Sequence, residues 1–574
     1  MVIPQGMSYA QNLAYLPQVY GLYGSFVPCI LYGLLGSSKQ LVVGPVAVTS
    51  LLLGSGLSNI YGNFLINPSD PQDALEQTWQ QRYNEGAIGV AFIAALFYTL
   101  VGLLRMGWVI NFLSVPVISG FMSGAASIII TGQIKYITGQ KLPRADTAYE
   151  NLKLVFMNFN LFKWREFVMG MSFIILLLLF KFLAKRYNRR LFWLQFAGPL
   201  TVCIISIAVM NIWDLYVQYP DNPQTPYIKP VGKIPRGMPA VTVSWWFPLY
   251  SPGPQIVLAF LICLLDIVES TSIARSLAVK NKYKLNGTQE LRGLGLANLG
   301  GAIFNCYTTT GSFSRSAVNN SVGACTQLAG IITGFTIMLV LLVLTPVFQN
   351  MSANVQGAIV IVGCLSLYDI PTMVKSWSIS KFDFLCWWTA FLVVFFCGAE
   401  IGIASAVGLS IVLFLIRNAF PRVRGIARLS GDVEEYESSH LFPDAKVLPP
   451  EDGIIAIRPE APLFFANAQF VRDHIEDKIK WARMDGYNPQ VVIIDLINAS
   501  TFDFTACHFI ETYADELLRE KITLVISSPT EPVLKALEAA KLIDIIGLKN
   551  IQLTLPEAIH RAYELAPPKV AVDL

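Results

Sequence analysis

The sequence predicts a polytopic α-helical membrane protein with a C-terminal soluble α/β domain. Of its 574 residues, 54% are hydrophobic and only 14% are charged, whereas soluble domains carry about 25% charged residues. Apolar runs such as 331–348 and 391–416 are long enough for membrane helices, which need roughly 20 residues. From about Pro421 charges become frequent, and short apolar strands alternate with helical segments. The expected domains are a membrane domain over 1–420, a linker over 421–450 and a soluble domain over 451–574.

Composition narrows the chemistry that the membrane domain can perform. The nine cysteines are scattered without a close pair, so buried free thiols are favoured over a metal site or disulfides. All four histidines lie in the soluble part, and so no membrane imidazole can bind a metal or carry a proton. There is no Walker A sequence and no enzyme motif. We therefore expect a non-enzyme that ATP does not drive, with no cofactor and no nucleic-acid partner.

The first stretch, "MVIPQGMSYAQ", is apolar and contains Pro4 and Gly6. It has neither the basic n-region nor the length of a signal peptide. We interpret it as the second half of a broken helix whose first half is missing.

Apolar runs and loop residues together predict fourteen membrane segments. The excess of Lys and Arg in alternate loops agrees with this number and predicts that the soluble domain is cytoplasmic. The predicted segments are 1–14, 16–36, 41–57, 88–106, 109–134, 167–184, 195–213, 254–274, 293–305, 312–322, 326–349, 355–371, 383–399 and 401–418.

Two of these segments, 41–57 and 312–322, are only about half as long as the membrane is thick. Each follows a stretch rich in Ser, Thr and Gly. Short, interrupted segments at corresponding positions of two halves indicate an inverted-repeat transporter with its site between them. Fourteen segments divide into seven plus seven, so the two half-helices are expected to meet near the midplane from opposite faces.

The ends of these half-helices predict an anion site. A helix that begins inside the membrane has unpaired N–H groups and a partial positive charge at its N-terminus, which attract anions. "TTTGSFSRS" adds hydroxyl donors and the full charge of Arg315. In the first half, Gly44 allows close backbone approach and Pro45 suits the first helical position. The alternative is that Arg315 extends to the membrane surface.

Two other features place polar groups in apolar helices. Gln5 and Tyr9 are four residues apart, on one helical face, where they could bind a ligand or simply pack between helices. Asp266 and Glu269 lie in the apolar segment 254–274, and membrane carboxylates are functional candidates by default. A desolvated carboxylate favours its neutral form, whereas a neighbouring arginine favours the charged one. A Glu269 that faces Arg315 would respond to a bound anion, which suggests proton–anion symport; a purely structural ion pair is the alternative.

Several motifs resemble the SulP family of anion transporters, most closely the proton-coupled sulfate transporters of plants and algae. They are "PQGMSYA", "YGLYGSFVPCILYGLLGSS", "VVGPVAVTSLL", "GLGLANLGGAIF" and "TGSFSRSAVNNSVGACTQLAG". The resemblance covers nearly the whole chain. It implies two inverted seven-helix repeats arranged as core and gate domains, a cytoplasmic STAS domain and a homodimer with contacts through that domain.

Site residues follow from the same resemblance, position by position. The family's acidic residue of the eighth helix, linked to proton coupling, falls on Glu269. Sulfate as the preferred anion comes from the resemblance alone, since hydroxyls and one arginine do not distinguish it from other oxyanions. The substrate-binding positions are Gln5, Tyr9, Pro45, Val46, Ala47, Ser314 and Arg315.

The soluble part resembles a STAS domain. In related bacterial regulators, an Asp-x-Ser/Thr-Gly loop carries a phosphorylatable residue. Here the loop reads Asp503-Phe504-Thr505-Ala506, with alanine in place of the glycine. Thr505 is therefore either a regulatory site or, more simply, a helix N-cap.

The resulting hypothesis is a proton-coupled sulfate symporter, with sulfate, protons and the lipid bilayer as partners and the plasma membrane as its location. An anion exchanger or channel of the same fold, for bicarbonate, chloride, oxalate or molybdate, is the first alternative. A membrane-anchored regulator that acts through the STAS domain is the second.

Overall fold

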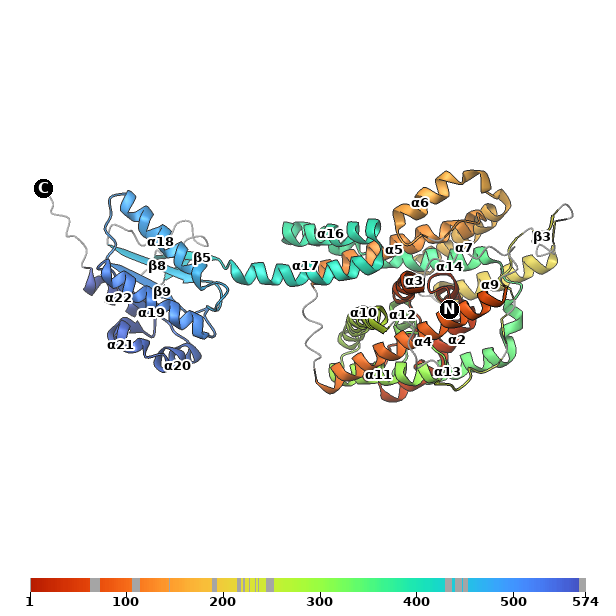
Figure 1. The fold of residues 1–574 in the computed structure, drawn as a ribbon, viewed down its shortest axis with the longest axis horizontal. Coiled ribbons are helices and arrows are strands. Elements are labelled where there is room, and N and C mark those ends of the chain that lie inside the picture. Colours follow the sequence, from red (N-terminus) through yellow and green to blue (C-terminus); the bar gives the residue numbers. More distant parts are fainter. Residues whose placement is uncertain are drawn as a thin grey trace. The chain divides into compact units, whose positions relative to one another are not determined.

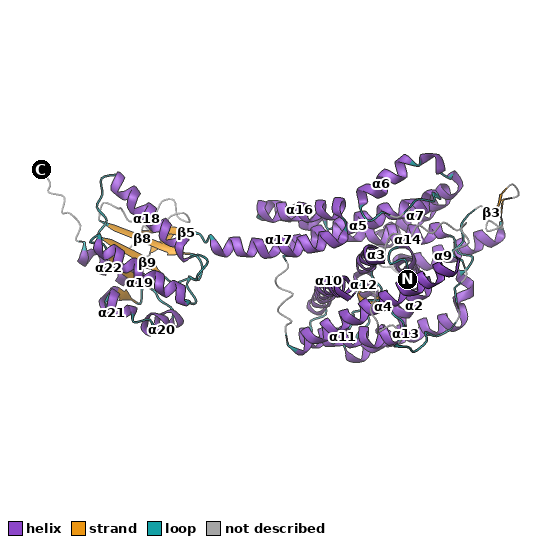
Figure 2. Ribbon diagram, viewed as in Figure 1, coloured by secondary structure: helices purple, strands orange, loops and turns teal. Residues whose placement is uncertain are grey.

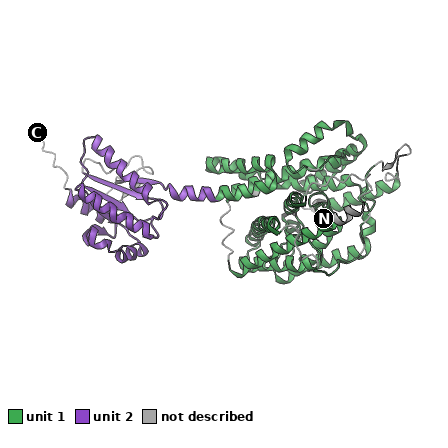
Figure 3. Cartoon of the chain, in the orientation of Figure 1, with its two compact units in different colours: residues 1–410 green, residues 411–574 purple. Residues whose placement is uncertain are grey.

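The computed structural model forms two compact units, residues 1–410 and 411–574 (Figure 3). Helices make up most of the first unit, and a sheet lies at the centre of the second (Figures 1 and 2). The described residues are 2–61, 73–105, 114–143, 145–187, 194–213, 252–428 and 453–566, with shorter pieces between 218 and 243 and between 436 and 447.

The helices run from the N-terminus to the end of α17 in the following order. They are α1 (Val2–Asn12), α2 (Gln18–Leu35), α3 (Ala47–Tyr61), α4 (Asp73–Leu103), α5 (Val115–Thr138), α6 (Ala148–Met157), α7 (Trp164–Arg186), α9 (Leu194–Ile212), α10 (Pro252–Lys280), α11 (Gly287–Ile303), α12 (Phe313–Ser321), α13 (Leu328–Leu339), α14 (Ala353–Cys364), α15 (Ile370–Ile379), α16 (Lys381–Cys397) and α17 (Ala399–Ala419). Four short strands accompany them: β1 (Val43–Gly44), β2 (Gln218–Tyr219), β3 (Asn222–Pro226) and β4 (Thr310–Gly311).

Eight helical stretches of the described residues are long and apolar enough to cross a membrane, and Ala197–Ile212 is a shorter apolar helix. The protein is therefore a multi-pass integral membrane protein. The half-helices α3 and α12 are too short to qualify by length, so the number of fourteen segments remains a prediction.

Some helix boundaries differ from those predicted. α4 begins at Asp73 rather than near residue 88, and α6 lies within the predicted loop 135–166. The predicted segment 355–371 is interrupted after α14, because the side chain of Asp369 accepts a hydrogen bond from the N–H of Thr372 and starts α15. An Asp N-cap followed by a proline is a strong helix start, which apolar periodicity alone does not reveal.

The membrane helices pack as two bundles, each built from both halves of the chain. α2, α3 and α4 contact α10, α11 and α13, and α1 packs against α2; α5, α6, α7 and α9 contact α14, α15 and α16. Glycines permit close crossings: a β-carbon on Gly21 would collide with the Gly6 carbonyl, and one on Gly120 with the Trp387 carbonyl. We call these the first and second bundles; interleaved halves are what an inverted repeat predicts.

The second unit is a mostly parallel sheet covered by helices. The strand order is β11-β10-β9-β8-β5-β6, and β7 also pairs with β5. β8, β9, β10 and β11 are parallel, and β5 is antiparallel to β8. The strands are β5 (Val423–Arg428), β6 (Tyr436–Ser438), β7 (Lys446–Val447), β8 (Ile454–Pro459), β9 (Val491–Asp495), β10 (Thr523–Ser527) and β11 (Ile551–Gln552). The helices are α18 (Ala468–Met484), α19 (Phe504–Arg519), α20 (Glu531–Ala539), α21 (Leu542–Ile546) and α22 (Leu555–Leu565).

Alternating strand residues form two apolar layers, one on each face of this sheet. One layer contains Ile494 and packs against α18, α19, α20 and α21. The other contains Ile493 and packs against α22. Part of the predicted linker over 421–450 lies in the sheet, since β5 pairs with β8.

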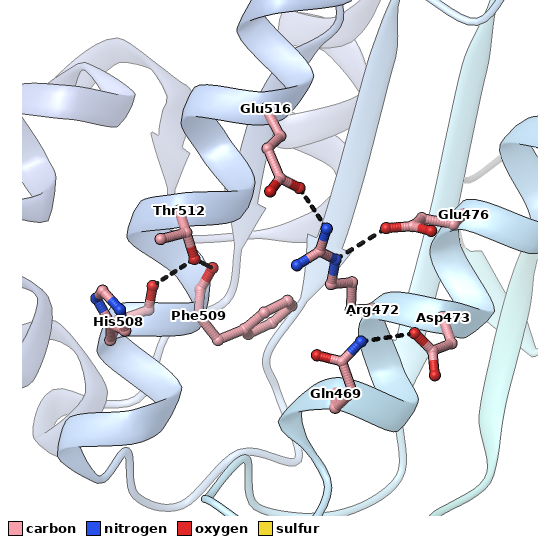
Figure 4. A network of polar contacts seen from close by, with 8 residues as sticks. All are labelled: Gln469, Arg472, Asp473, Glu476, His508, Phe509, Thr512 and Glu516. Atoms are coloured by element: carbon pink, nitrogen blue, oxygen red, sulfur yellow. Dashed lines mark hydrogen bonds and ion pairs between the residues drawn. The ribbon is translucent and has the colours of Figure 1, made fainter.

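An ionic network joins α18 to α19 (Figure 4). Arg472 of α18 donates to Glu476 on its own helix at 2.8 Å and to Glu516 of α19 at 2.6 Å. Because these groups are partly exposed, the network contributes little to stability beyond fixing the angle of the two helices.

Candidate functional site

The two half-helices begin beside a short crossing of two strands. β1 and β4 pair antiparallel, with Val43 opposite Gly311 and Gly44 opposite Thr310. The N–H of Ser312 also donates to the carbonyl of Val42 at 3.1 Å. Since α3 follows β1 and α12 follows β4, the antiparallel crossing brings the N-termini of both half-helices to one place and directs the helices apart. The sequence predicted this meeting, although not the strands that produce it.

The start of each half-helix can now be placed. α12 begins at Phe313, and the Ser312 hydroxyl accepts from the N–H of Arg315, as an N-cap does. α3 begins at Ala47, whereas the predicted segment begins at residue 41. Pro45 therefore precedes the helix rather than occupying its first position. The extended strand at Val43–Gly44 delays the helix by several residues.

Arg315 lies at the centre of this arrangement and is 3% exposed. Its Nη2 donates to the carbonyl of Pro45 at 2.6 Å, while Nε and Nη1 are buried and meet no hydrogen-bond partner among the described residues. Arg315 therefore does not extend to the membrane surface. A buried guanidinium with two unpaired donors costs several kcal/mol, and an anion that accepts from both would offset this cost.

Gly44 gives the guanidinium its space. A β-carbon on Gly44 would lie 2.6 Å from Arg315 Nη1 and 3.3 Å from its Cζ. Any side chain at this position would displace the arginine, so close approach explains the glycine, as predicted.

Gln5 and Tyr9 of α1 both lie buried and point towards α14. A β-carbon on Gly363 would be 3.8 Å from the Tyr9 hydroxyl and 3.9 Å from Gln5 Nε2. Tyr9 also lies within electrostatic range of Arg315 and Glu269, and Gln5 Oε1 is buried without a partner. The two side chains therefore reach the region of the arginine and are not fully used in helix packing.

The two carboxylates of α10 have different surroundings. Asp266 is fully buried and accepts hydrogen bonds from Thr49 of α3 and, at 2.6 Å, from Tyr98 of α4. Glu269 lies within electrostatic range of Asp266 and Arg315, but its Oε2 is buried without a partner. The expected contact between Glu269 and Arg315 is not a direct hydrogen bond in the described residues, because Arg315 bonds the Pro45 carbonyl instead.

Polar residues that the sequence analysis did not single out hold the lead-in to α12. Asn298 of α11 binds Thr309 through the threonine N–H at 2.8 Å, its hydroxyl and its carbonyl. The hydroxyl of Ser270 accepts from the N–H of Gly311 at 2.8 Å. The buried Thr308 hydroxyl has no partner. An amide in the motif "GLGLANLGG" was the available signal for Asn298.

Most of the predicted site residues are buried in the structure. Gln5, Tyr9, Pro45, Val46, Ala47 and Arg315 are all buried, and Glu269 is 9% exposed. Ser314 belongs to the first turn of α12, and its side chain lies outside the described part of the structure.

Thr505 lies apart from this site, exposed in the first turn of α19. It is not the N-cap, contrary to the simpler interpretation of the sequence. Asp503 caps α19 by accepting from the N–H of Ala506 at 2.8 Å, and its other oxygen accepts from the N–H of Phe465 at 2.8 Å. The carboxylate outcompetes the threonine because Asp is a preferred N-cap residue.

Comparisons with known proteins agree with this architecture. Family models described as "Sulfate permease family" and "STAS domain" match residues 1–390 and 445–558. "Probable sulfate transporter 4.2" of Arabidopsis thaliana is 35% identical over 568 residues, which are 98% of this chain and 79% of the relative. "High affinity sulfate transporter 2" of Stylosanthes hamata is 31% identical over 570 residues, 97% and 81% of the two chains.

A solved structure shares the fold. "The overall structure of SLC26A9" aligns with a TM-score of 0.84 at 22% identity and covers 98% of this chain and 88% of that one. The paired strands bring the two half-helices together, and the second unit is built on a sheet. Together with these features, the matches give one conclusion: the chain belongs to the sulfate permease family and carries a C-terminal STAS domain.

Proposed function

We propose that the protein carries sulfate across a membrane by symport with protons, through alternating access of a site between α3 and α12. The observation that carries this proposal is the buried Arg315 guanidinium, whose Nε and Nη1 lack partners beside two helix N-termini. A tetrahedral dianion can accept from a free guanidinium donor and from backbone N–H groups at the same time. The names of the relatives, which are sulfate transporters, support sulfate as the anion.

The substrate site that we propose contains Gln5, Tyr9, Pro45, Val46, Ala47, Ser314 and Arg315. Pro45 contributes through its carbonyl, which orients the guanidinium, rather than as a ligand of the anion. Val46 directly precedes α3 and Ala47 begins it, so the two residues form the N-terminus of this helix, where N–H groups have no partner within the helix.

Glu269 is proposed as the proton-coupling residue. Asp266 is held by two hydroxyl donors, whereas Glu269 Oε2 has none. An unpaired buried carboxylate is costly in its charged form, and a second negative charge on the nearby sulfate increases that cost. Proton uptake by Glu269 would therefore accompany sulfate binding, and release of both on the other side would complete symport.

Uptake of labelled sulfate into proteoliposomes tests the proposal. Sulfate should accumulate when an inwardly directed proton gradient is imposed and should stop accumulating when a proton ionophore collapses the gradient. Accumulation that ignores the gradient would contradict symport. It would favour the second candidate, an anion exchanger or channel of the same fold.

Competition extends the same assay to selectivity. Unlabelled selenate, molybdate, oxalate, bicarbonate and chloride are added in excess on the uptake side. The proposal expects inhibition by the tetrahedral dianions. Stronger inhibition by bicarbonate or chloride than by sulfate itself would argue for the exchanger or channel.

Location and assembly are further parts of the proposal. We place the protein in the plasma membrane, with the STAS domain cytoplasmic, as a homodimer with contacts through that domain. One relative is named "Sulfate transporter 4.1, chloroplastic", so imaging of a tagged chain against plasma-membrane and organelle markers decides between the two membranes. Mass photometry of the protein in nanodiscs measures its oligomeric state, and a monomer would contradict the homodimer.

A further inference from the structure

One face of α1 carries a row of buried polar side chains. Gln5, Ser8 and Asn12 are spaced i, i+3 and i+7, so they lie on the same face of the helix. They are 2%, 0% and 3% exposed. The row begins at the proposed anion site with Gln5 and ends at the C-terminal end of α1.

This face lies against the second bundle. Asn12 Nδ2 donates to Oε1 of Gln133 on α5 at 3.2 Å. Gln133 in turn adjoins α14, since a β-carbon on Gly357 would be 3.7 Å from its carbonyl. At the other end of the row, Gln5 approaches Gly363, which also belongs to α14. The polar row therefore follows the boundary between the two bundles.

Several polar atoms along this boundary are buried without a hydrogen-bond partner in the part of the chain that the structure describes. They are Gln5 Oε1, Ser8 Oγ, Asn12 Oδ1 and, on α14 next to Gly357, Gln356 Nε2. Buried polar atoms in proteins nearly always have partners. A row of exceptions, aligned with the binding site, marks a place that holds water or a polar ligand at another stage.

Apolar side chains close the same boundary. Met7 of α1 belongs to a buried cluster that includes Ile137 of α5 and Val355, Ala358 and Ile359 of α14. The boundary is thus shut in this structure, and the polar row is held inside it.

We infer that Gln5, Ser8, Asn12 and Gln356 line an access path for the hydrated anion between the binding site and the C-terminal end of α1, and that the Asn12–Gln133 hydrogen bond is the latch that closes it. The inference rests on the proposed transport of sulfate. When the bundles separate, the Ser8 hydroxyl and the Gln356 amide donate to the anion, and the free carbonyl oxygens accept from its water. Because Asn12 and Gln133 belong to different bundles, they must part in each transport cycle.

A pair of cysteines tests the latch. In the Asn12→Cys/Gln133→Cys variant, oxidation, or a thiol cross-linker that spans the space of the removed side chains, should join the two cysteines through disulfide bonds, verified by mass spectrometry. Sulfate uptake into proteoliposomes should then fall to background. Reduction should restore uptake. An intact disulfide with undiminished uptake would overturn the inference.

Two controls accompany this pair. Each single cysteine variant, oxidised in the same way, accounts for the nine native cysteines. The pair Tyr61→Cys/Gln255→Cys replaces two residues that share a hydrogen bond of 2.8 Å between α3 and α10, both in the first bundle. A bridge of the same kind within one bundle, verified by mass spectrometry, should leave uptake unchanged.

The path itself is tested without a disulfide. Gln356→Leu should lower the maximal uptake rate by about tenfold, which corresponds to about 1.4 kcal/mol in the barrier, while the Kd for sulfate in detergent stays within about twofold. Ser8→Ala should act in the same direction. Equal loss of rate and affinity, or no loss of rate, would contradict the path. If the unsubstituted protein moves no sulfate at all, the proposed function fails instead, and the two failures are therefore distinct.

Discussion

The Nη2 atom of Arg315 donates a hydrogen bond of 2.6 Å to the carbonyl oxygen of Pro45, 270 residues earlier in the chain. This bond joins the beginning of one half-helix to the lead-in of the other. It fixes one edge of the guanidinium and leaves Nε and Nη1 for a ligand. Arg315 thus belongs to the second half of the chain by sequence, but it contacts the backbone of the first half as well.

Arg315→Lys should lower the affinity for sulfate by about tenfold to a hundredfold, or about 1.4–2.8 kcal/mol. A lysine is a point charge and cannot hold the Pro45 carbonyl while presenting further donors in the fixed plane of a guanidinium. Equilibrium binding of labelled sulfate to the purified protein measures the effect. Arg292→Lys is the matched control, because Arg292 binds the Gly102 carbonyl at 3.1 Å between α11 and α4. Equal affinities in the two variants would refute a binding role for Arg315.

Gly44→Ala should weaken sulfate binding without removing any polar group. The added methyl would lie 2.6 Å from Arg315 Nη1 and must push the guanidinium from its place. The same binding measurement applies. Gly253→Ala, where a β-carbon meets nothing within 4 Å, should bind sulfate normally. If Gly44→Ala binds as the parent does, then Arg315 does not need its observed position.

Glu269→Gln should separate transport from the proton gradient. The neutral amide imitates a permanently protonated carboxylate, so sulfate should still bind and exchange across the membrane, but an imposed gradient should no longer drive accumulation. Proteoliposome uptake with and without a pH difference measures this. Full gradient-driven uptake by the variant would show that the proton travels elsewhere.

Asp266→Asn should instead reduce stability. The two carboxylate oxygens accept from Thr49 and Tyr98. Because an amide has a single oxygen, one of these donors loses its acceptor, at a cost of about 1–3 kcal/mol. We expect a lower melting temperature of the purified protein. Sulfate uptake by the protein that remains folded should still be driven by the proton gradient. Loss of coupling at normal stability would reverse the roles that we assign to the two carboxylates.

Asp503→Ala should destabilise the second unit by about 0.5–2 kcal/mol, the usual cost of losing an N-cap. Thr505→Ala should change stability by less than about 0.5 kcal/mol, as exposed substitutions usually do. Hydrogen exchange of the amides of α19 in the full chain measures both. Similar protection in the two variants would mean that Asp503 is not the effective cap.

The sequence was sufficient to predict the two halves, the short helices at their third positions and the group of polar residues around Arg315. Periodicity and composition carry that information because apolar length and helix-breaking residues are local properties. The strand crossing of β1 and β4 was not predictable, since two-residue strands have no periodicity. The division of labour between Asp266 and Glu269 also required the structure, because it depends on hydroxyls of α3 and α4 that are distant in sequence.

The strand crossing has a consequence for how the protein is made. The N–H of Val42 finds its partner, the Ser316 hydroxyl, only 274 residues later. At about 5–20 residues per second, the ribosome needs about 14–55 seconds to synthesise that interval. During that time the N–H of Val42 lacks this partner. The first half of the chain can therefore complete its fold only after the second half has been synthesised.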